Sequence, residues 1–139
     1  MIAIWPDALP RPERGTWQSQ PQDARRKRQS DAGPPAYRRR FSSVAKMVTL
    51  SLILSREEAA VFDRFFHEDC AEGSLLFTMP DPTTDGWPML SSSGEPLLAA
   101  PGVPLLLSAS WLCAWGDTMP TETLVGLEFR KSFSVVVLP

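Results

Sequence analysis

Residues that commonly carry out catalysis are scarce in this sequence. Its 139 residues include one histidine, His67, and contain neither a glycine-rich phosphate loop nor a Gly-x-Ser-x-Gly nucleophile motif. A single histidine excludes a multi-histidine metal site, and His67 lies in a predicted helix, where a partly exposed structural role is expected. The paired carboxylates Glu57–Glu58 and Glu68–Asp69 fall at the ends of that helix, where capping and solvation explain them. We therefore expect no catalytic residues, no metal and no cofactor.

Long hydrophobic runs are also missing. No stretch approaches the roughly 18 uninterrupted apolar residues of a membrane-spanning helix. Met1–Pro6 has no charged n-region, so we expect neither membrane association nor a signal peptide. The only two cysteines, Cys70 and Cys113, occupy apolar positions, which favours two reduced core thiols over a disulfide. With 43% hydrophobic residues, a chain of this length is expected to form one core.

The net charge of −2 conceals an uneven distribution. Residues 1–46 contain ten basic and four acidic side chains, whereas residues 47–139 contain four basic and twelve acidic ones. Six prolines between Pro6 and Pro35 prevent a long helix in the first part. Residues 1–40 are therefore predicted to be an extended basic arm that lies along a surface without forming a core, anchored by Trp5 and Trp17. Residues 41–139 are predicted to be a single folded domain.

Two basic clusters in the arm supply the candidate subunit-interface residues. These are Arg25, Arg26, Lys27, Arg28, Arg38, Arg39 and Arg40. Three interpretations stay open: a solvated loop, attraction to the acidic body of a neighbouring subunit, and contact with nucleic acid. Tyr37 is the only ring between the clusters, so the aromatic interleaving typical of base stacking is nearly absent. Because Arg38–Arg40 precedes the first core strand, we expect it to be held more firmly than Arg25–Arg28.

The clearest structural signals lie between residues 46 and 80. Alternating apolar residues over 47–54 predict a strand with one buried face. Ser55 stands three residues before Glu58, the spacing of a capping box, at the start of a helix predicted over about residues 55–70. Gly73 ends this helix, and a second strand follows up to Pro80. The predicted structural core residues are Val48, Leu50, Leu52, Ser55, Glu58, Phe62, Phe66, Phe77, Trp111 and Phe129.

The remainder of the chain is predicted to be a long loop and two strands. Residues 81–104 are rich in proline and serine, and we expect this loop to reach a neighbouring molecule. Alternation predicts strands over 105–115 and 123–138, and Lys131 interrupts the second, which indicates a bend, a bulge or a position at the sheet rim. The expected fold is mainly β, an antiparallel sandwich or barrel with one flanking helix.

The central segment also resembles a known family. Val48–Ser51, Ser55–Ala59, Phe65–Phe66, Gly73 and Phe77–Pro80 are similar to the centre of the minor tail protein M family of lambda-like siphophages, over about residues 38–80. Gly15–Gln18 resembles the family's early Gly-aromatic-x-Gln element, and Val135–Val137 corresponds to its last strand. Residues 81–104 depart from the family, whose members often have aromatic residues there.

This resemblance implies a tail-tube-like fold and a structural role in the virion. The protein would form a hexameric ring at the distal end of a siphovirus tail, joining the tail tube to the tail-tip or baseplate complex. Its partners would be other copies of itself, the major tail tube protein and tail-tip hub proteins, with DNA passing through the lumen without sequence-specific binding. It would be assembled in the host cytoplasm and located in the virion tail.

Two alternatives are kept. A terminator or stopper ring at the head end of the tail uses similar small β folds. A small DNA-binding regulator with a basic arm belongs to a different class. It is disfavoured because the sequence has no helix-turn-helix pattern and the predicted body is acidic.

Overall fold

The computed structural model of the chain describes residues 2–139. Strands account for 41% of the residues and helical turns for 10%, which confirms the predicted class, mainly β with one helix. Seven strands form one mixed sheet in the order β1-β6-β9-β11-β5-β2, with β10 beside β11 and β1 parallel to β6. These strands are β1 (Ala3–Ile4), β2 (Gln18–Pro21), β5 (Lys46–Leu54), β6 (Phe77–Pro80), β9 (Ser110–Trp115), β10 (Thr121–Val125) and β11 (Glu128–Val137).

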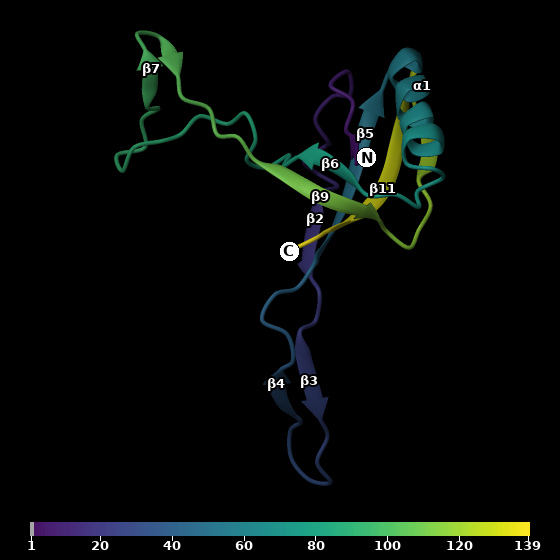
Figure 1. The fold of residues 1–139 in the computed structure, drawn as a ribbon, viewed down its shortest axis with the longest axis vertical. Coiled ribbons are helices and arrows are strands. Elements are labelled where there is room, and N and C mark those ends of the chain that lie inside the picture. Colours follow the sequence, from purple (N-terminus) through teal and green to yellow (C-terminus); the bar gives the residue numbers. More distant parts are fainter. Residues whose placement is uncertain (1) are drawn as a thin grey trace.

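Two small hairpins lie outside this sheet. One pairs β3 (Arg25–Arg28) with β4 (Ala36–Arg39), and the other pairs β7 (Leu98–Ala100) with β8 (Val103–Pro104). Figure 1 shows that they project from the body in different directions.

Strand β11 joins the two halves of the main sheet. It pairs with β5 continuously from Phe129↔Leu54 to Val137↔Lys46, and with β9 through Val135–Val137 at its carboxyl end. In Figure 1, β6 and β9 run steeply across β5 and β11. The sheet thus folds over one core, an arrangement that fits the coarse sandwich class.

The buried face of β5 is the one that alternation predicted. Val48, Leu50, Leu52 and Leu54 are all fully buried. Alternate residues of β6, β9 and β11 complete the buried face. They are Phe77, Met79, Trp111, Cys113, Phe133, Val135 and Val137. Among the predicted core residues, Phe129 differs: it is partly buried and packs against the edge of this cluster.

The helix has the predicted position and cap. It runs as α1 (Arg56–Arg64) and continues as one π-helical turn, η1 (Phe65–Asp69). The backbone N–H of Glu58 donates to Ser55 Oγ at 3.3 Å, and that of Ser55 donates to Glu58 Oε1 at 2.9 Å, so the capping box is confirmed. Ser55 is exposed and Glu58 partly so; both stabilise the helix end without packing in the core.

The π turn and the loop after it set where the helix ends. Cys70 N–H donates to the Phe65 carbonyl at 2.9 Å, and the wider turn leaves Phe65, Phe66 and Cys70 all buried. The chain then passes through three residues with positive φ, Ala71, Glu72 and Gly73. A Cβ on Gly73 would lie 2.9 Å from the Phe66 ring, so glycine is required there for both space and conformation.

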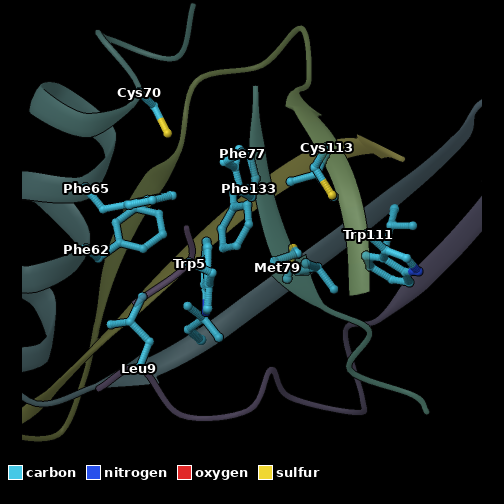
Figure 2. Packing of buried hydrophobic residues seen from close by; sticks show 14 of the residues in the cluster. Trp5, Leu9, Phe62, Phe65, Cys70, Phe77, Met79, Trp111, Cys113 and Phe133 are labelled. Carbon is cyan, nitrogen blue, oxygen red and sulfur yellow. The ribbon is translucent and has the colours of Figure 1, made fainter. Parts of the chain in front are cut away.

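The amino-terminal segment contradicts the prediction of a surface arm over residues 1–40. Trp5 and Leu9 are buried in the core. The Trp5 ring packs 5.4 Å from Phe65, 5.9 Å from Phe77 and 5.9 Å from Phe133, between ring centroids (Figure 2). β1 and β2 extend the two edges of the main sheet. Residues 2–21 therefore belong to the folded body.

Two strands are shorter than predicted. β9 begins at Ser110 because Leu105 and Leu107 instead pair with the preceding loop, where Leu107 N–H donates to the Trp87 carbonyl at 2.7 Å. The strand predicted over 123–138 is broken by a two-residue turn at Gly126–Leu127, with φ of +61° at Gly126. Glycine at the first central position is typical of a type II′ hairpin turn. Leu127 is consequently 99% exposed instead of facing the core.

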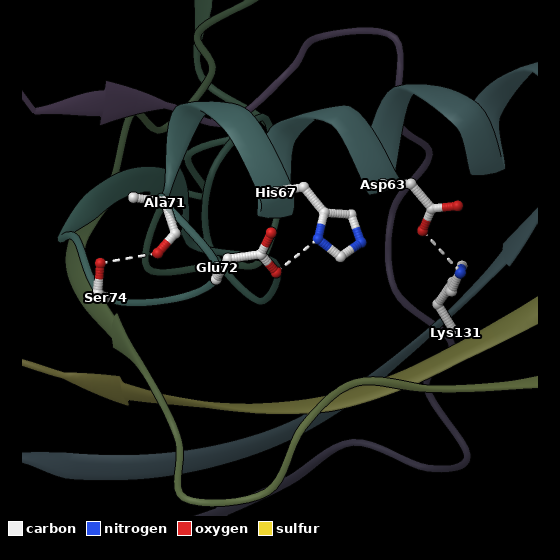
Figure 3. A network of polar contacts seen from close by, with 6 residues as sticks. All are labelled: Asp63, His67, Ala71, Glu72, Ser74 and Lys131. Atoms are coloured by element: carbon white, nitrogen blue, oxygen red, sulfur yellow. Dashed lines mark hydrogen bonds and ion pairs between the residues drawn. The ribbon is translucent and has the colours of Figure 1, made fainter.

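Lys131 lies on the buried face of β11. The register with β5 continues through Lys131↔Leu52, so the expected bend or bulge was wrong. The lysine Nζ is 2.8 Å from Asp63 Oδ1 on α1 (Figure 3) and 2.9 Å from Glu122 Oε1 on β10. Burial by itself lowers the pKa of Lys131, but the two carboxylates outweigh it and the net shift is upward. Partners on two other elements thus permit a cation at a core position.

Replacing Phe62 should test the core. Phe62 is 1% exposed and contacts both Trp5 and Phe133, so Phe62→Ala is expected to lower the free energy of unfolding by about 3–5 kcal/mol. Leu127→Ala, at an exposed apolar position, is the control and should change it by less than about 0.5 kcal/mol. Urea titration measures both, and equal stability of the two variants would contradict this packing.

Lys131 allows a second test of stability. Lys131→Met keeps the volume and removes the buried charge, so the free energy of unfolding at pH 7 should stay equal or rise. Replacing both Asp63 and Glu122 with alanine leaves the ammonium unpaired and should cost about 2 kcal/mol. Because the folded-state pKa of Lys131 is raised, its stabilisation is complete below the unfolded-state pKa and is lost as pH rises through the folded-state pKa. Thermal melts between neutral pH and pH 11 should show a smaller alkaline loss in Lys131→Met, and an equal loss would contradict this.

Candidate functional site

The two basic clusters form the two strands of one hairpin, residues 22–45, which we call the basic ribbon. Its register sets Arg25 opposite Arg39, Arg26 opposite Arg38 and Lys27 opposite Tyr37. The ribbon continues the β2–β5 pair, since Pro21 faces Lys46 and Gln22 N–H donates to the Ala45 carbonyl at 2.9 Å. It extends away from the body (Figure 1). Because the clusters lie side by side, the expected difference in their anchoring was wrong.

Like charges face each other across the basic ribbon. Arg26 and Arg38 share one face, and Arg25 and Arg39 share the other. Opposed like charges weaken a two-stranded ladder. Arg25 has a carboxylate partner, Asp23, at 3.1 Å, and its guanidinium lies 4.3 Å from the centre of the Tyr37 ring. All eight residues of β3 and β4 are exposed, so the ribbon is a dense positive surface in water.

Residues 86–107 form a second projection, the apolar arm, which covers most of the predicted loop 81–104 and the start of the strand predicted over 105–115. Three of its backbone segments are hydrogen-bonded in a cycle. The N–H of Leu105 donates to the Leu97 carbonyl, the N–H of Leu97 to the Met89 carbonyl, and the N–H of Met89 to the Leu105 carbonyl, each at 2.8 Å. Its large side chains remain exposed, with Leu98 at 57% and Leu106 at 59%. The arm therefore has an ordered backbone and presents apolar surface to water.

The root of the apolar arm is fixed by the amino-terminal segment. Arg11 donates to the Asp85 carbonyl at 2.7 Å and to the Pro82 carbonyl at 3.4 Å. The guanidinium of Arg14 lies 4.7 Å from the centre of the Trp87 ring. Asp85 Oδ1 also accepts the Ala109 N–H at 2.9 Å. These contacts join both ends of the arm to the body.

A polar cluster fastens the same segment to the outer face of the sheet. Glu13 accepts hydrogen bonds from the buried Ser51 hydroxyl and from Arg130, whose Nε lies 3.0 Å from Glu13 Oε2. Thr16 also contacts Ser51. The Ser51 hydroxyl first, and Arg130 second, hold the pKa of Glu13 below its ordinary value. This stabilisation is present above the ordinary glutamate pKa and is lost as pH falls through the folded-state value.

The side chains with reactive groups have structural surroundings. His67 is exposed, and its Nδ1 lies 2.7 Å from Glu72 Oε2, across the turn that ends the helix (Figure 3). Cys70 and Cys113 are free and buried, which confirms the predicted thiols. Burial raises the pKa of Cys113 to about 12, so it is a neutral thiol at physiological pH. In the described part of the chain, no group of three histidine, cysteine or acidic side chains is arranged to hold a metal.

No helix within residues 2–139 is long and apolar enough to cross a membrane.

Comparisons with protein-family models, curated proteins and solved structures found no significant match for this chain. The candidate site therefore consists of the two projections, the basic ribbon and the apolar arm. The sequence identified all seven cations of the basic ribbon. It did not predict that the apolar arm is an ordered element.

The exposure of the basic ribbon predicts where proteases act first. Trypsin should cut the free protein at Arg25–Arg28 and Arg38–Arg40 before it cuts elsewhere, because these residues lie on an isolated, exposed hairpin. Arg56 and Arg64, which are exposed but held in α1, serve as internal controls. Mass spectrometry of the early fragments measures the order of cleavage. First cuts within α1, with the ribbon intact, would contradict the exposure described.

Proposed function

We propose that this protein is a ring-forming structural component of a long, non-contractile phage tail. The ring, hexameric by family resemblance, would lie at the distal end of the tail tube. It would join the major tail tube protein to the tail-tip hub proteins and leave a channel for DNA.

The observation that carries this proposal is the pair of projections on a small body. The basic ribbon is a two-stranded hairpin, a structure that is marginally stable in water by itself. The apolar arm exposes large side chains that a monomeric soluble protein usually covers. The apolar arm is expected of a subunit whose exposed surface is covered by a neighbour, and the ribbon is expected of a subunit whose hairpin is stabilised by a bound partner.

Ring closure supplies a physical use for such projections. In a cyclic assembly, each subunit presents one surface to the next and a different surface to the previous one. The apolar arm leaves the body on the side away from α1 (Figure 1), so it can cover a neighbour while the core of its own subunit stays intact. Burial of one exposed leucine in such a contact contributes about 1.5–3 kcal/mol.

The two alternative functions, a head-proximal ring and a DNA-binding regulator, differ in what they require of the structure. A head-proximal terminator or stopper ring would use the same subunit contacts and differs in its place in the particle. A DNA-binding regulator that uses a recognition helix is disfavoured. In the described residues α1 is the one α-helix, and its Phe62 face is buried against the sheet.

Self-association of the purified protein tests the ring. The parent should form closed rings, visible by negative-stain electron microscopy and as one large species in sedimentation velocity. Changing Leu98 and Leu106 together to serine should weaken association at least tenfold, because these two are among the most exposed apolar side chains of the arm.

The matched control makes the same kind of change, from an apolar residue to serine, at two positions outside the apolar arm. Met119→Ser with Leu124→Ser alters two exposed apolar residues near β10 and should leave assembly unchanged. A parent that stays monomeric at high concentration, or a control that is as defective as the arm variant, would refute the proposed role of the arm. Density for the subunit at the distal or the head end of a tail particle would separate the two ring positions.

A further inference from the structure

We propose that the basic ribbon binds the phosphate backbone of double-stranded nucleic acid, without sequence preference. This inference stands on the ribbon itself and does not depend on ring formation.

The register makes the ribbon a regular array of cations. Arg26 and Arg38 are directly opposite, and Arg28 lies two residues further along the same face. Side chains two apart on a strand are roughly 7 Å apart, so this face presents three guanidinium groups within about two residue spacings. Arginine is suited to phosphate because its planar fork donates two parallel hydrogen bonds.

The ribbon has little to neutralise it within its own chain. Residues 22–45 hold seven basic side chains and two acidic ones, Asp23 and Asp31. Of the seven cations, Arg25 is the one with a carboxylate within 4 Å in the described structure. The ribbon also points away from the body (Figure 1), and the carboxylate that Arg25 contacts, Asp23, belongs to the ribbon itself.

A second copy of the chain is a poorer partner for this surface than a phosphate backbone. Eight of the 16 carboxylates already accept hydrogen bonds within the described chain. The other eight are spread over seven segments between Asp7 and Glu128, and Glu68–Asp69 is the largest group on any one of them. Double-stranded DNA offers one charge per roughly 1.7 Å of its axis.

The shape of the ribbon favours a duplex over a single strand. A two-stranded β-ribbon fits the major groove, which is about 12 Å wide. Single-strand binding relies on rows of aromatic side chains, and Tyr37, the ring among the β3 and β4 residues, is already covered by Arg25 on one face. We therefore assign the ribbon to duplex backbone contacts.

Binding of the full-length protein to a labelled DNA duplex, measured by fluorescence anisotropy across a salt series, tests the proposal. If Arg26, Arg28 and Arg38 each contact a phosphate, the affinity should fall about 40-fold between 50 and 200 mM salt. Arg26→Gln with Arg38→Gln should weaken binding at low salt at least tenfold and reduce this salt effect to about fourfold. Removing this opposed like-charge pair does not weaken the ladder, so a loss of binding reports lost contacts.

The control removes the same charge elsewhere. Arg56→Gln with Arg64→Gln takes two exposed cations from α1 and should leave binding within about twofold of the parent. Equal losses in both double variants, or unchanged binding in the ribbon variant, would overturn the proposal.

A competition experiment separates phosphate from carboxylate partners. Poly-glutamate with the same number of charges as the duplex should displace it poorly, because its charges are less dense and less regular. If poly-glutamate displaces the duplex equally well, and the Arg26/Arg38 variant loses self-association in sedimentation velocity, the ribbon binds another copy of the chain and the proposal is wrong.

Discussion

Insertion of Trp5 into the aromatic core is the interaction on which the rest of the structure depends. Its ring contacts Phe62 and Phe65 from the helix, Phe77 from β6 and Phe133 from β11. Such ring pairs contribute about 0.5–1.5 kcal/mol each beyond their buried area. The chain that follows Trp5 supplies Arg11 at the root of the apolar arm and β2 at the base of the basic ribbon. One segment, residues 2–21, therefore closes the core and positions both projections.

The parts of the fold that could be predicted are those encoded by local pattern. The buried face of β5 follows from alternation, and the start of α1 follows from the Ser55 to Glu58 spacing. Trp5 could not be placed in this way, because Pro6 and Pro10 follow it and interrupt any regular pattern, and its aromatic partners are 57 to 128 residues away. Leu127 was wrongly predicted to face the core. The alternation of β10 and β11 continues across the Gly126 turn, although the chain reverses there.

The candidate site was predictable in composition and not in geometry. The seven cations are evident from the sequence, but their pairing depends on the turn between β3 and β4, where Gly33 has φ of +91°. The apolar arm is harder still, because its prolines argue against strands and its order comes from a three-way hydrogen-bond cycle among Met89, Leu97 and Leu105. Lys131 shows the same limit: its carboxylate partners lie on α1 and β10, and spacing along β11 contains no sign of them.

The two projections respond to different conditions, because different forces govern their contacts. Contacts of the basic ribbon are electrostatic and weaken as salt shortens the screening length to about 8 Å. Contacts of the apolar arm come from removal of apolar surface from water, which salt does not screen. Their roots are also separate, the ribbon on the β2–β5 pair and the arm on Arg11 and Ala109. A change in ionic strength would therefore act on the contacts of the ribbon with a partner, while the apolar contacts of the arm and of the core would be retained.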